Sequence, residues 1–251
     1  MSDGPHLPPG IRLVRFGDID STNDEARRQA EAGAPAGLLI CADRQSLGRG
    51  RRGRTWDSPA GNLYTSLLLR PTVAPAIAAQ LSFVTALAVA DAVRAALPGG
   101  PVISCKWPND VLVGGAKISG ILLESGTRPD GRLDWLVVGA GINLASHPVD
   151  TAYPATSIQA QGGQVERDVL LSSYVAAFHR WMYLWQEQGF APIRTAWLGR
   201  ADGLGHPVVV KLAQDSLHGI FSSLNAVGAL LLQLPSGEIR TIAAGDVFRA
   251  A

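Results

Sequence analysis

The chain has few of the features that mark secreted or disulfide-linked proteins. Its 251 residues include only two cysteines, Cys41 and Cys105, and each lies in an apolar, strand-like run. Such positions favour buried, reduced thiols over a disulfide or a metal-binding pair. The opening residues, MSDGPHLPPG, contain neither a basic nor an apolar segment. We therefore expect no secretory signal and predict a cytoplasmic protein.

The sequence also lacks a long uninterrupted hydrophobic run and a strong net charge. Its most apolar stretch, residues 77–97, contains polar side chains at Gln80, Ser82, Thr85, Asp91 and Arg94. This polar content argues against a membrane-spanning helix. Lysine and arginine total 22 against 21 aspartate and glutamate, which gives a formal net charge of +1 at pH 7. Because general nucleic-acid-binding proteins are more often basic throughout, the composition disfavours that class.

Helical and strand-like patterns alternate along most of the chain. Capping residues and periodicity predict helices over residues 22–32, 75–97, 166–188 and 190–199. The second of these is apolar on most sides, so we expect it to be largely buried. Strand-like runs fall at residues 38–44, 62–71, 101–107, 110–125 and 133–145, with turns at 114–115 and 126–131.

The pattern changes after residue 202. Only short strand-like runs separated by turn residues follow, and no helix fits them. We therefore predict an α+β domain over residues 1–202 and a small all-β domain over residues 203–251.

The segment QSLGRGRRGRTWDS, residues 45–58, is an arginine-rich loop. Its four arginines repel one another, and it contains almost nothing that can be buried, so it cannot fold on its own. The interspersed glycines let backbone N–H groups approach an anionic ligand while the arginine side chains surround its charge. The alternative is a solvated turn or a nucleic-acid contact. Trp56 either anchors the loop or stacks on a purine, and the composition favours a loop that an anion orders.

The KWPND motif and the lysine that follows it are a second group of polar residues. The proline ends a strand and leaves Asn109 and Asp110 in a turn, where they either cap the backbone or face a ligand. Lys117 comes after the next turn. Pairing across that hairpin brings Lys117 near Asn109 and Asp110, whereas an edge-strand lysine would point to water.

Two more motifs admit two interpretations each. The glycines of VVGAGINL, Gly139 and Gly141, mark a place where a ligand or another backbone comes close, but the run is not a dinucleotide fingerprint. In DSTND, residues 20–24, Ser21 and Thr22 either cap the helix or face a polar ligand.

Taken in order, these motifs resemble one family, the biotin protein ligases, also called biotin–acetyl-CoA-carboxylase ligases. The family pattern runs from STN through a GRGRRGR-x-W loop, KWPND and a lysine before a GIL run to GxGIN. The corresponding segments here are Ser21-Thr22-Asn23, GRGRRGRTW (48–56), KWPND (106–110), Lys117 before SGILLE, and GAGIN (139–143). The resemblance implies an α+β catalytic domain, a mixed sheet flanked by helices as in class II synthetases, and an SH3-like C-terminal barrel.

The resemblance also implies a reaction and its residues. Biotin and ATP form biotinyl-5′-AMP, and the biotinyl group then passes to a lysine of a biotin carboxyl carrier protein. The expected biotin-binding residues are Ser21, Thr22, Asn23, Gln45, Gly48, Arg49, Gly50, Lys117 and Gly120. The expected ATP- or AMP-binding residues are Arg51, Arg54, Trp56, Asn109, Lys117 and Asn143.

Three of these positions are expected to be catalytic. Lys117 and Arg51 stabilise charge, because attack of a carboxylate on the α-phosphorus brings two anions together. Asp110 orients or deprotonates the incoming lysine amine, and the role of Arg52 stays open.

The implied substrates are biotin, the carrier protein, and ATP with Mg²⁺ on its phosphates, with no resident metal. The ligase-like pattern begins by about Ile11, so we expect no helix-turn-helix, no DNA binding and no membrane partner, while a homodimer stays open. A lipoate or octanoate ligase is the nearest alternative, but the arginine-rich loop and the trailing β-domain favour biotin. An RNA-binding module is disfavoured by the near-neutral charge and the lack of a recognisable aromatic platform.

Overall fold

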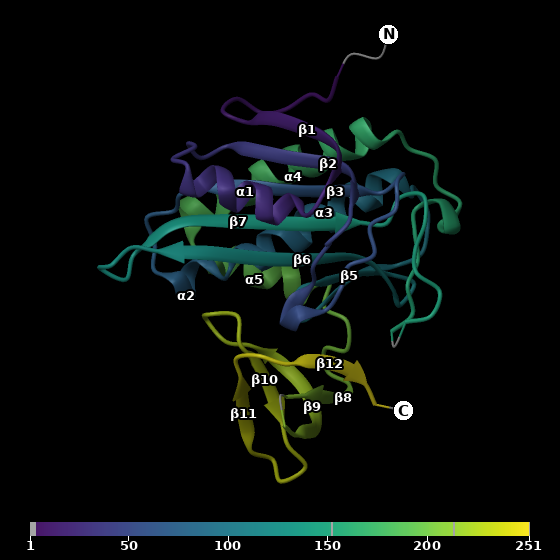
Figure 1. The fold of residues 1–251 in the computed structure, drawn as a ribbon. Helices are drawn as coiled ribbons and strands as arrows, with labels where there is room; N and C mark the ends of the chain where they lie inside the picture. The colour runs from purple at the N-terminus through teal and green to yellow at the C-terminus, as the bar shows by residue number, and fades with distance from the viewer. Residues whose placement is uncertain (1–3, 152, 213, 251) are drawn as a thin grey trace.

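The computed structural model describes residues 4–151, 153–212 and 214–250, which form two sheets with helices around the larger one (Figure 1). The larger sheet contains β1 (Arg12–Ile19), β2 (Leu38–Gln45), β3 (Leu63–Leu69), β4 (Ile103–Lys106), β5 (Asp110–Val113), β6 (Ala116–Thr127) and β7 (Leu133–Ile142). Its helices are α1 (Thr22–Glu31), α2 (Pro75–Ala78), α3 (Leu81–Ala96), α4 (Arg167–Gln188) and α5 (Phe190–Leu198). The second sheet contains β8 (Pro207–Lys211), β9 (Ser216–Leu224), β10 (Leu230–Gln233), β11 (Ile239–Ile242) and β12 (Asp246–Arg249).

The larger sheet is mixed and runs in the order β1-β2-β3-β7-β6-β5-β4. Only β1 and β2 are parallel, and every other neighbouring pair is antiparallel. The edges are therefore β1 and β4, and β6 lies inside the sheet. This placement removes the interpretation of Lys117, on β6, as an edge-strand lysine.

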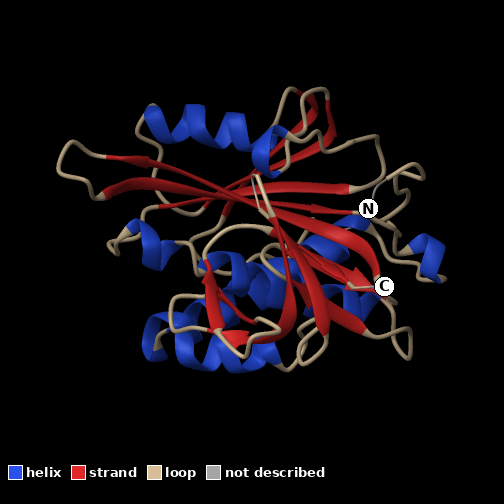
Figure 2. Cartoon of the chain, turned by 90° about the horizontal axis from the view of Figure 1, so that it is seen from below, coloured by secondary structure: helices blue, strands red, loops and turns tan. Residues whose placement is uncertain are grey.

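Helices cover both faces of this sheet, with α1 on one face and α3 to α5 on the other (Figure 2). In β2, Leu38 and Ile40 belong to the smaller buried cluster with α1, whereas Leu39 and Cys41 belong to the larger cluster with α3 and α4. Successive side chains of a strand point to opposite faces. Burial on both faces explains why the strands read as nearly continuous apolar runs.

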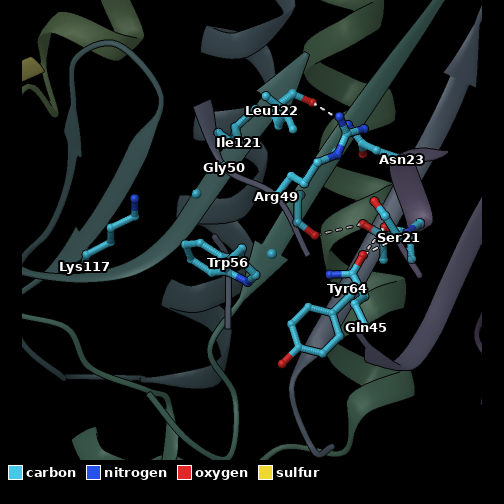
Figure 3. Close-up of a pocket in the computed structure, with 16 residues that line it drawn as sticks. Ser21, Asn23, Gln45, Arg49, Gly50, Trp56, Tyr64, Lys117, Ile121 and Leu122 are labelled. Atoms are coloured by element: carbon cyan, nitrogen blue, oxygen red, sulfur yellow. Dashed lines mark hydrogen bonds between the residues drawn. The ribbon is translucent and has the colours of Figure 1, made fainter. Parts of the chain in front are cut away.

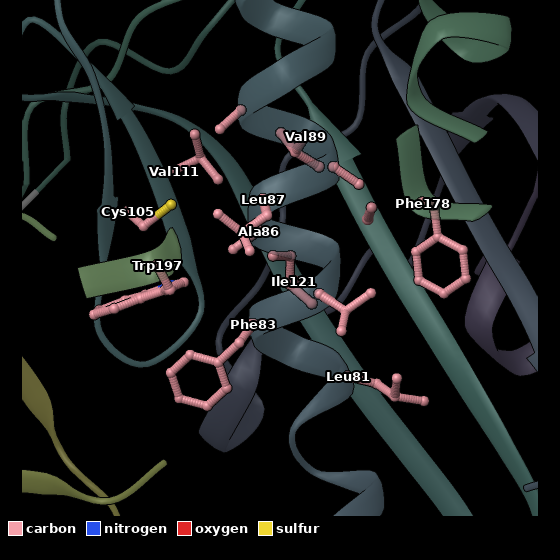
Figure 4. Close-up of a cluster of buried hydrophobic side chains, with 14 of the residues drawn as sticks. Leu81, Phe83, Ala86, Leu87, Val89, Cys105, Val111, Ile121, Phe178 and Trp197 are labelled. Atoms are coloured by element: carbon pink, nitrogen blue, oxygen red, sulfur yellow. The ribbon is translucent and has the colours of Figure 1, made fainter. Parts of the chain in front are cut away.

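Helix α3 lies at the centre of the larger core (Figure 4). Its Phe83 meets the edges of Phe190 and Trp197, with ring centroids 5.3 Å apart in each pair. The span Pro75–Ala96 is long and apolar enough to cross a membrane, but 72% of its most apolar window is buried inside the protein. It is the buried core helix that the sequence predicts.

The C-terminal strands form an antiparallel sheet in the order β11-β10-β9-β8-β12, and this is the expected SH3-like domain. Its apolar side joins the core of the first domain, because Val208 and Phe221 belong to the same buried cluster as α3. The indole nitrogen of Trp107 donates to the carbonyl oxygen of Gly228 at 3.0 Å. The two domains therefore share one apolar interior.

Most predicted helices and strands are present, with three differences. Strand β1 was not predicted, because RLVRFGDI lacks a clear apolar alternation and lies half-exposed at the sheet edge. The predicted helix over 75–97 is divided into α2 and α3. Asp110 is not in a turn but is the first residue of β5, where it pairs with Gly120. Cys41 and Cys105 are buried free thiols, as predicted.

Candidate active site

A depression on the α1 face of the larger sheet forms where strand positions carry no side chain. Gly139 and Gly141 of β7 lie there, and Gly141 pairs with Gly120 of β6. Further along the same face of β7, Trp135 and Val137 fill the space beside α1. Residues two apart on a strand share a face, so the change from large residues to glycine leaves room where α1 begins.

The space above these glycines is a cavity, here called the sheet cavity (Figure 3). It is lined by Ser21, Thr22, Asn23, Gln45, Arg49, Gly50, Trp56, Tyr64, Thr65, Lys117, Gly120, Ile121, Leu122, Gly139, Ala140 and Gly141. Of the residues expected to bind biotin, all but Gly48 are in this set. Gly48 lies just behind it, where a Cβ atom would overlap Ser58 and the Trp56 carbonyl.

The polar wall of the sheet cavity is one connected hydrogen-bond network at the start of α1. The backbone nitrogen of Thr22 donates to Gln45 Oε1 at 2.8 Å, and Gln45 Nε2 donates to Ser58 Oγ at 2.9 Å. Ser66 Oγ lies 2.8 Å from Thr22 Oγ1 and 2.5 Å from Asn23 Oδ1. Because every member has a partner, the network holds its donors and acceptors in fixed directions.

The arginine-rich loop is a tight hairpin beside this wall. Arg49 and Thr55 form a short antiparallel bridge, and the backbone nitrogen of Gly50 donates to the carbonyl oxygen of Arg54 at 2.7 Å. Arg52 turns the chain with a φ of 57°, a left-handed conformation that is uncommon outside glycine.

The loop arginines do not all converge on one place. Arg49 reaches toward α1 and β6, where it pairs with Asp24 at 2.8 Å and Glu124 at 3.1 Å. Arg54 reaches the other way and pairs with Asp246 on β12 of the C-terminal domain. The loop therefore connects the α1 region with the C-terminal domain.

Arg51 has a different environment from the other loop arginines. It donates to Asn109 Oδ1 at 3.1 Å, and among the residues that the structure describes no carboxylate forms an ion pair with it. Burial lowers the pKa of the Arg51 guanidinium, because desolvation disfavours its charged form. An anionic ligand would stabilise this cation. The neighbouring Arg52 pairs with Asp246 at 3.4 Å.

Trp56 covers the glycine floor of the sheet cavity. A Cβ atom at Gly141 would lie 2.6 Å from Trp56 Nε1, and one at Gly120 would lie 2.9 Å from Trp56 Cζ3. The indole ring therefore needs glycine at both positions. Its buried nitrogen has no hydrogen-bond partner among the residues that the structure describes, which leaves a donor for a ligand.

Lys117 reaches the same region because of a β-bulge. The register of β5 against β6 shifts between Val111 and Leu112, which makes Ile118 an extra residue in β6. The shift turns Lys117 to the side of Gly120, where its Nζ lies 3.4 Å from the position of a Cβ atom. Its ammonium group is 5.3 Å from the centre of the Trp56 ring.

Asp110 holds two ammonium groups. Lys117 Nζ lies 2.7 Å from Asp110 Oδ1, and Lys106 Nζ lies 3.4 Å from Oδ2. Lys106 is buried and faces the rings of Tyr153 at 4.5 Å and Phe248 at 5.4 Å. A buried lysine requires such partners. The hairpin prediction is confirmed for Lys117 and Asp110.

A second cavity, here called the β12 cavity, lies between the two domains. It is lined by Arg54, Thr55, Trp56, Asp57, Lys106, Asp110, Lys117, Asn143, Pro148, Thr151, Tyr153, Ala155, Asp246 and Phe248. Trp56 and Lys117 line both cavities. The β12 cavity measures about 360 Å³ and the sheet cavity about 50 Å³, so the sheet cavity is the narrower of the two.

The expected nucleotide-binding residues divide into two groups. Arg54, Trp56, Lys117 and Asn143 line the β12 cavity. Arg51 and Asn109 contact each other at a third cavity beside Gly228, and the structure does not bring them to the β12 cavity.

Several site residues were missed by the sequence analysis. Lys106 belongs to the KWPND motif, but the motif by itself does not predict a role for this lysine in the site. Tyr153, Asp246 and Glu124 carry no local sequence signal, because only the three-dimensional fold brings them to the site.

Comparison with known proteins gives a class for this fold and site. The Biotin/lipoate A/B protein ligase family matches residues 16–143, and the Biotin protein ligase C terminal domain matches residues 203–249. The fold and the paired cavities thus define a protein ligase of the biotin/lipoate class.

Individual relatives narrow this class. The chain is 43% identical over 235 residues to a biotin–[acetyl-CoA-carboxylase] ligase of Paracoccus denitrificans, covering 91% of this chain and 97% of that one. It is 32% identical to the bifunctional ligase/repressor BirA of Escherichia coli, covering 91% and 71%. The biotin protein ligase from Aquifex aeolicus in complex with biotin and ATP superposes with a TM-score of 0.81 at 29% identity, covering 95% and 99%. The chain belongs to the biotin protein ligase family.

Proposed function

We propose that this protein activates biotin with ATP as biotinyl-5′-AMP and transfers the biotinyl group to a lysine of a biotin carboxyl carrier protein or domain. The observation that carries the proposal is that Lys117 and Trp56 line both cavities. Ligands in the two cavities would meet at these side chains. The Aquifex relative was solved with biotin and ATP together, which supports two adjoining subsites.

The first half-reaction joins the two ligands. Thr22 and Gln45, with buried Ser66 behind them, would supply polar groups for the ureido ring of biotin, whose carboxylate then lies toward Lys117. A carboxylate oxygen attacks the α-phosphorus of MgATP, an acyl-phosphate bond forms, and the bond to pyrophosphate breaks. Lys117 lowers the repulsion between the two anions, because its ammonium group is fixed before they meet.

The second half-reaction transfers the acyl group. The amine of the acceptor lysine attacks the acyl carbon, the bond to AMP breaks, and the amine releases one proton to the solvent. Both oxygens of Asp110 are held by lysines, and this supports an orienting role for Asp110. Lys117 again balances charge as AMP leaves.

The arginine-rich loop would protect the intermediate. An acyl adenylate reacts with water and with any nearby amine, so the site has to exclude both. Arg51 lies next to Asn109 at the third cavity, so a shift of the loop would have to bring it to the anionic adenylate, which would then complete its pairing. We propose that this contact keeps the loop closed over the intermediate.

The proposal extends to partner and setting. The acetyl-CoA carboxylase named for the Paracoccus relative supports a carboxyl carrier protein or domain as acceptor. We also propose that the enzyme works in the cytoplasm.

A homodimer would use an edge of the larger sheet, where β1 pairs with β2 alone in the described part of the chain. Sedimentation velocity measures this association directly.

The test is pyrophosphate release with MgATP and, in parallel, biotin, lipoate, octanoate or no acid. We expect release with biotin only and an adenylate that stays with the protein. Release with lipoate or octanoate alone would assign the protein to the other branch of the family. Folded protein that releases nothing with any acid would overturn the ligase proposal.

A further inference from the structure

Glu124 lies beside the sheet cavity but does not line it. On β6 it pairs with Val137, and the neighbouring pair on the same face is Leu122 with Gly139. Its side chain is 26% exposed, and its carboxylate accepts hydrogen bonds from Asn23 Nδ2 at 2.7 Å and from Arg49 at 3.1 Å. One carboxylate therefore contacts both α1 and the arginine-rich loop.

Contacts with the Glu124 carboxylate and, at 3.5 Å, with the Leu122 carbonyl oxygen fix the orientation of the Asn23 amide (Figure 3). A carboxylate only accepts hydrogen bonds, so the NH₂ group of Asn23 faces Glu124 and its Oδ1 faces Ser66 at 2.5 Å. Asn23 is 5% exposed and is packed against Gly139, where a Cβ atom would overlap its amide. The amide thus has one arrangement that satisfies both of its ends.

The fixed Asn23 amide determines which partner receives the hydroxyl proton of Ser66 and, through it, the hydroxyl proton of Thr22. Ser66 has one hydroxyl proton, and Oδ1 of Asn23 can only accept, so Ser66 donates to Asn23. Thr22 then gives its own proton to Ser66, at 2.8 Å, or to Gln45 Oε1, at 3.1 Å. In both arrangements a protein acceptor takes the Thr22 proton, so the lone pairs of the Thr22 oxygen stay free for a ligand. The site therefore offers an acceptor to a ligand N–H group.

We infer that Glu124 is a positioning residue that makes the sheet cavity complementary to the ureido N–H group of the substrate. The inference rests on the proposed function, since biotin is the ligand concerned. Without Glu124, only the 3.5 Å contact with the Leu122 carbonyl oxygen opposes a turn of the Asn23 NH₂ group toward Ser66. Ser66 then donates to Thr22 instead and occupies one of the two lone pairs that the Thr22 oxygen offers to the ureido ring, which weakens this acceptor.

Glu124 also pairs with Arg49, so the experiment has to distinguish the loss of this ion pair from the loss of the hydrogen bond to Asn23. Asp24 also pairs with Arg49, but it makes no contact with the Asn23 side chain. Asp24→Asn is therefore a matched control that weakens the Arg49 tether, and with it the exposed pair between Asp24 and Arg27, without touching a hydrogen bond of the Asn23 side chain. Glu124→Gln is a conservative variant, because its amide oxygen can still accept from Asn23.

The experiment measures ligand binding to the full chain by titration calorimetry without ATP. For Glu124→Ala we expect the Kd of biotin and of desthiobiotin, which keeps the ureido ring, to rise about tenfold, the effect of one lost hydrogen bond. Competition by octanoate, which has no ring, should not change. Glu124→Gln and Asp24→Asn should bind biotin within about twofold of wild type, which a merely structural role for Glu124 would not predict.

A second test exchanges the amide of Asn23 with the carboxylate of Glu124. Asn23→Asp places two carboxylates together and should weaken biotin binding, and Asn23→Asp combined with Glu124→Gln should restore it, because the new amide donates to the new carboxylate. Unchanged biotin binding in folded Glu124→Ala would overturn the inference. Equal weakening in Asp24→Asn, or no recovery in the exchanged pair, would overturn it as well. Wild-type protein that binds no biotin would instead overturn the proposed function.

Discussion

Lys117 Nζ lies 2.7 Å from Oδ1 of Asp110, at the point where the sheet cavity and the β12 cavity meet. The bulge in β6 turns the lysine to this side, and the first residue of β5 supplies the carboxylate. The ammonium group is thus held in place before a ligand arrives. A preorganised charge of this kind lowers the barrier for a reaction between two anions.

Replacement of this lysine tests the first half-reaction. Lys117→Ala removes the only side-chain cation that lines both cavities among the described residues, and we expect biotin-dependent pyrophosphate release to fall about 10² to 10³-fold. Arg94→Ala removes an exposed cation from α3 and should keep wild-type activity. Near-normal release by Lys117→Ala would remove this residue from the catalytic group.

Two adjacent arginines of the loop should behave differently. Arg51→Gly removes the desolvated cation beside Asn109, and we expect biotinyl-AMP to escape and to label lysines of an unrelated protein. Arg52→Gly places glycine at a φ of 57°, which glycine adopts readily, and should retain the intermediate. Mass spectrometry of a bystander protein measures both. Labelling confined to the carrier lysine in Arg51→Gly would contradict the role given to Arg51.

The glycine floor gives a third prediction. In Gly141→Ala, the added methyl group would lie 2.6 Å from Trp56 Nε1, so the indole ring has to move. Because Trp56 lines both cavities, KM should rise for biotin and for ATP, and overpacking should cost about 1–3 kcal/mol of stability. Gly17→Ala, with nothing within 4 Å of its added Cβ, is the control. A rise in only one KM would show that Trp56 serves a single ligand.

A fourth prediction concerns acid stability. Hydrogen bonds from Arg28 are the main reason why the pKa of Asp20 falls from 3.8 to about 2. Asp20 therefore contributes stability above pH 3.8, and this contribution is lost as the pH falls toward 2. The advantage of wild type over Asp20→Asn should shrink across that interval in urea denaturation, with exposed Asp18→Asn as control. The effect will be small, because the Asp20 side chain is 37% exposed.

The sequence predicted those parts of the fold that local patterns determine. Helix caps, apolar periodicity and glycine turns located α1, α4 and α5 and most strands of the larger sheet, because each pattern lies within one element. Strand β1 was missed, since pairing with β2 rather than its own residues makes it a strand.

The residues of the site also fall into two groups: those that a local motif predicts and those that only the three-dimensional fold brings together. Motifs brought the residues of the sheet cavity to attention, but the partners of the loop arginines come from distant parts of the chain. Asp246 is an ordinary residue of a short strand until the second domain folds against the loop. Glu124 is unremarkable in sequence because its partner Asn23 lies on another element. Such pairs depend on tertiary packing, which no local pattern contains.

The contact between Trp107 and Gly228 has a thermodynamic consequence. The Trp107 indole bonds to the Gly228 carbonyl at 3.0 Å, and a Cβ atom at Gly228 would lie 2.6 Å from the Phe83 ring, so the two sheets meet as closely as the layers of one core. We therefore expect both domains to unfold together, with no break in cooperativity at the change of sheet near residue 202. We expect one calorimetric unfolding transition for the whole chain, and a ligand held by the larger sheet should raise the melting temperature of both domains together.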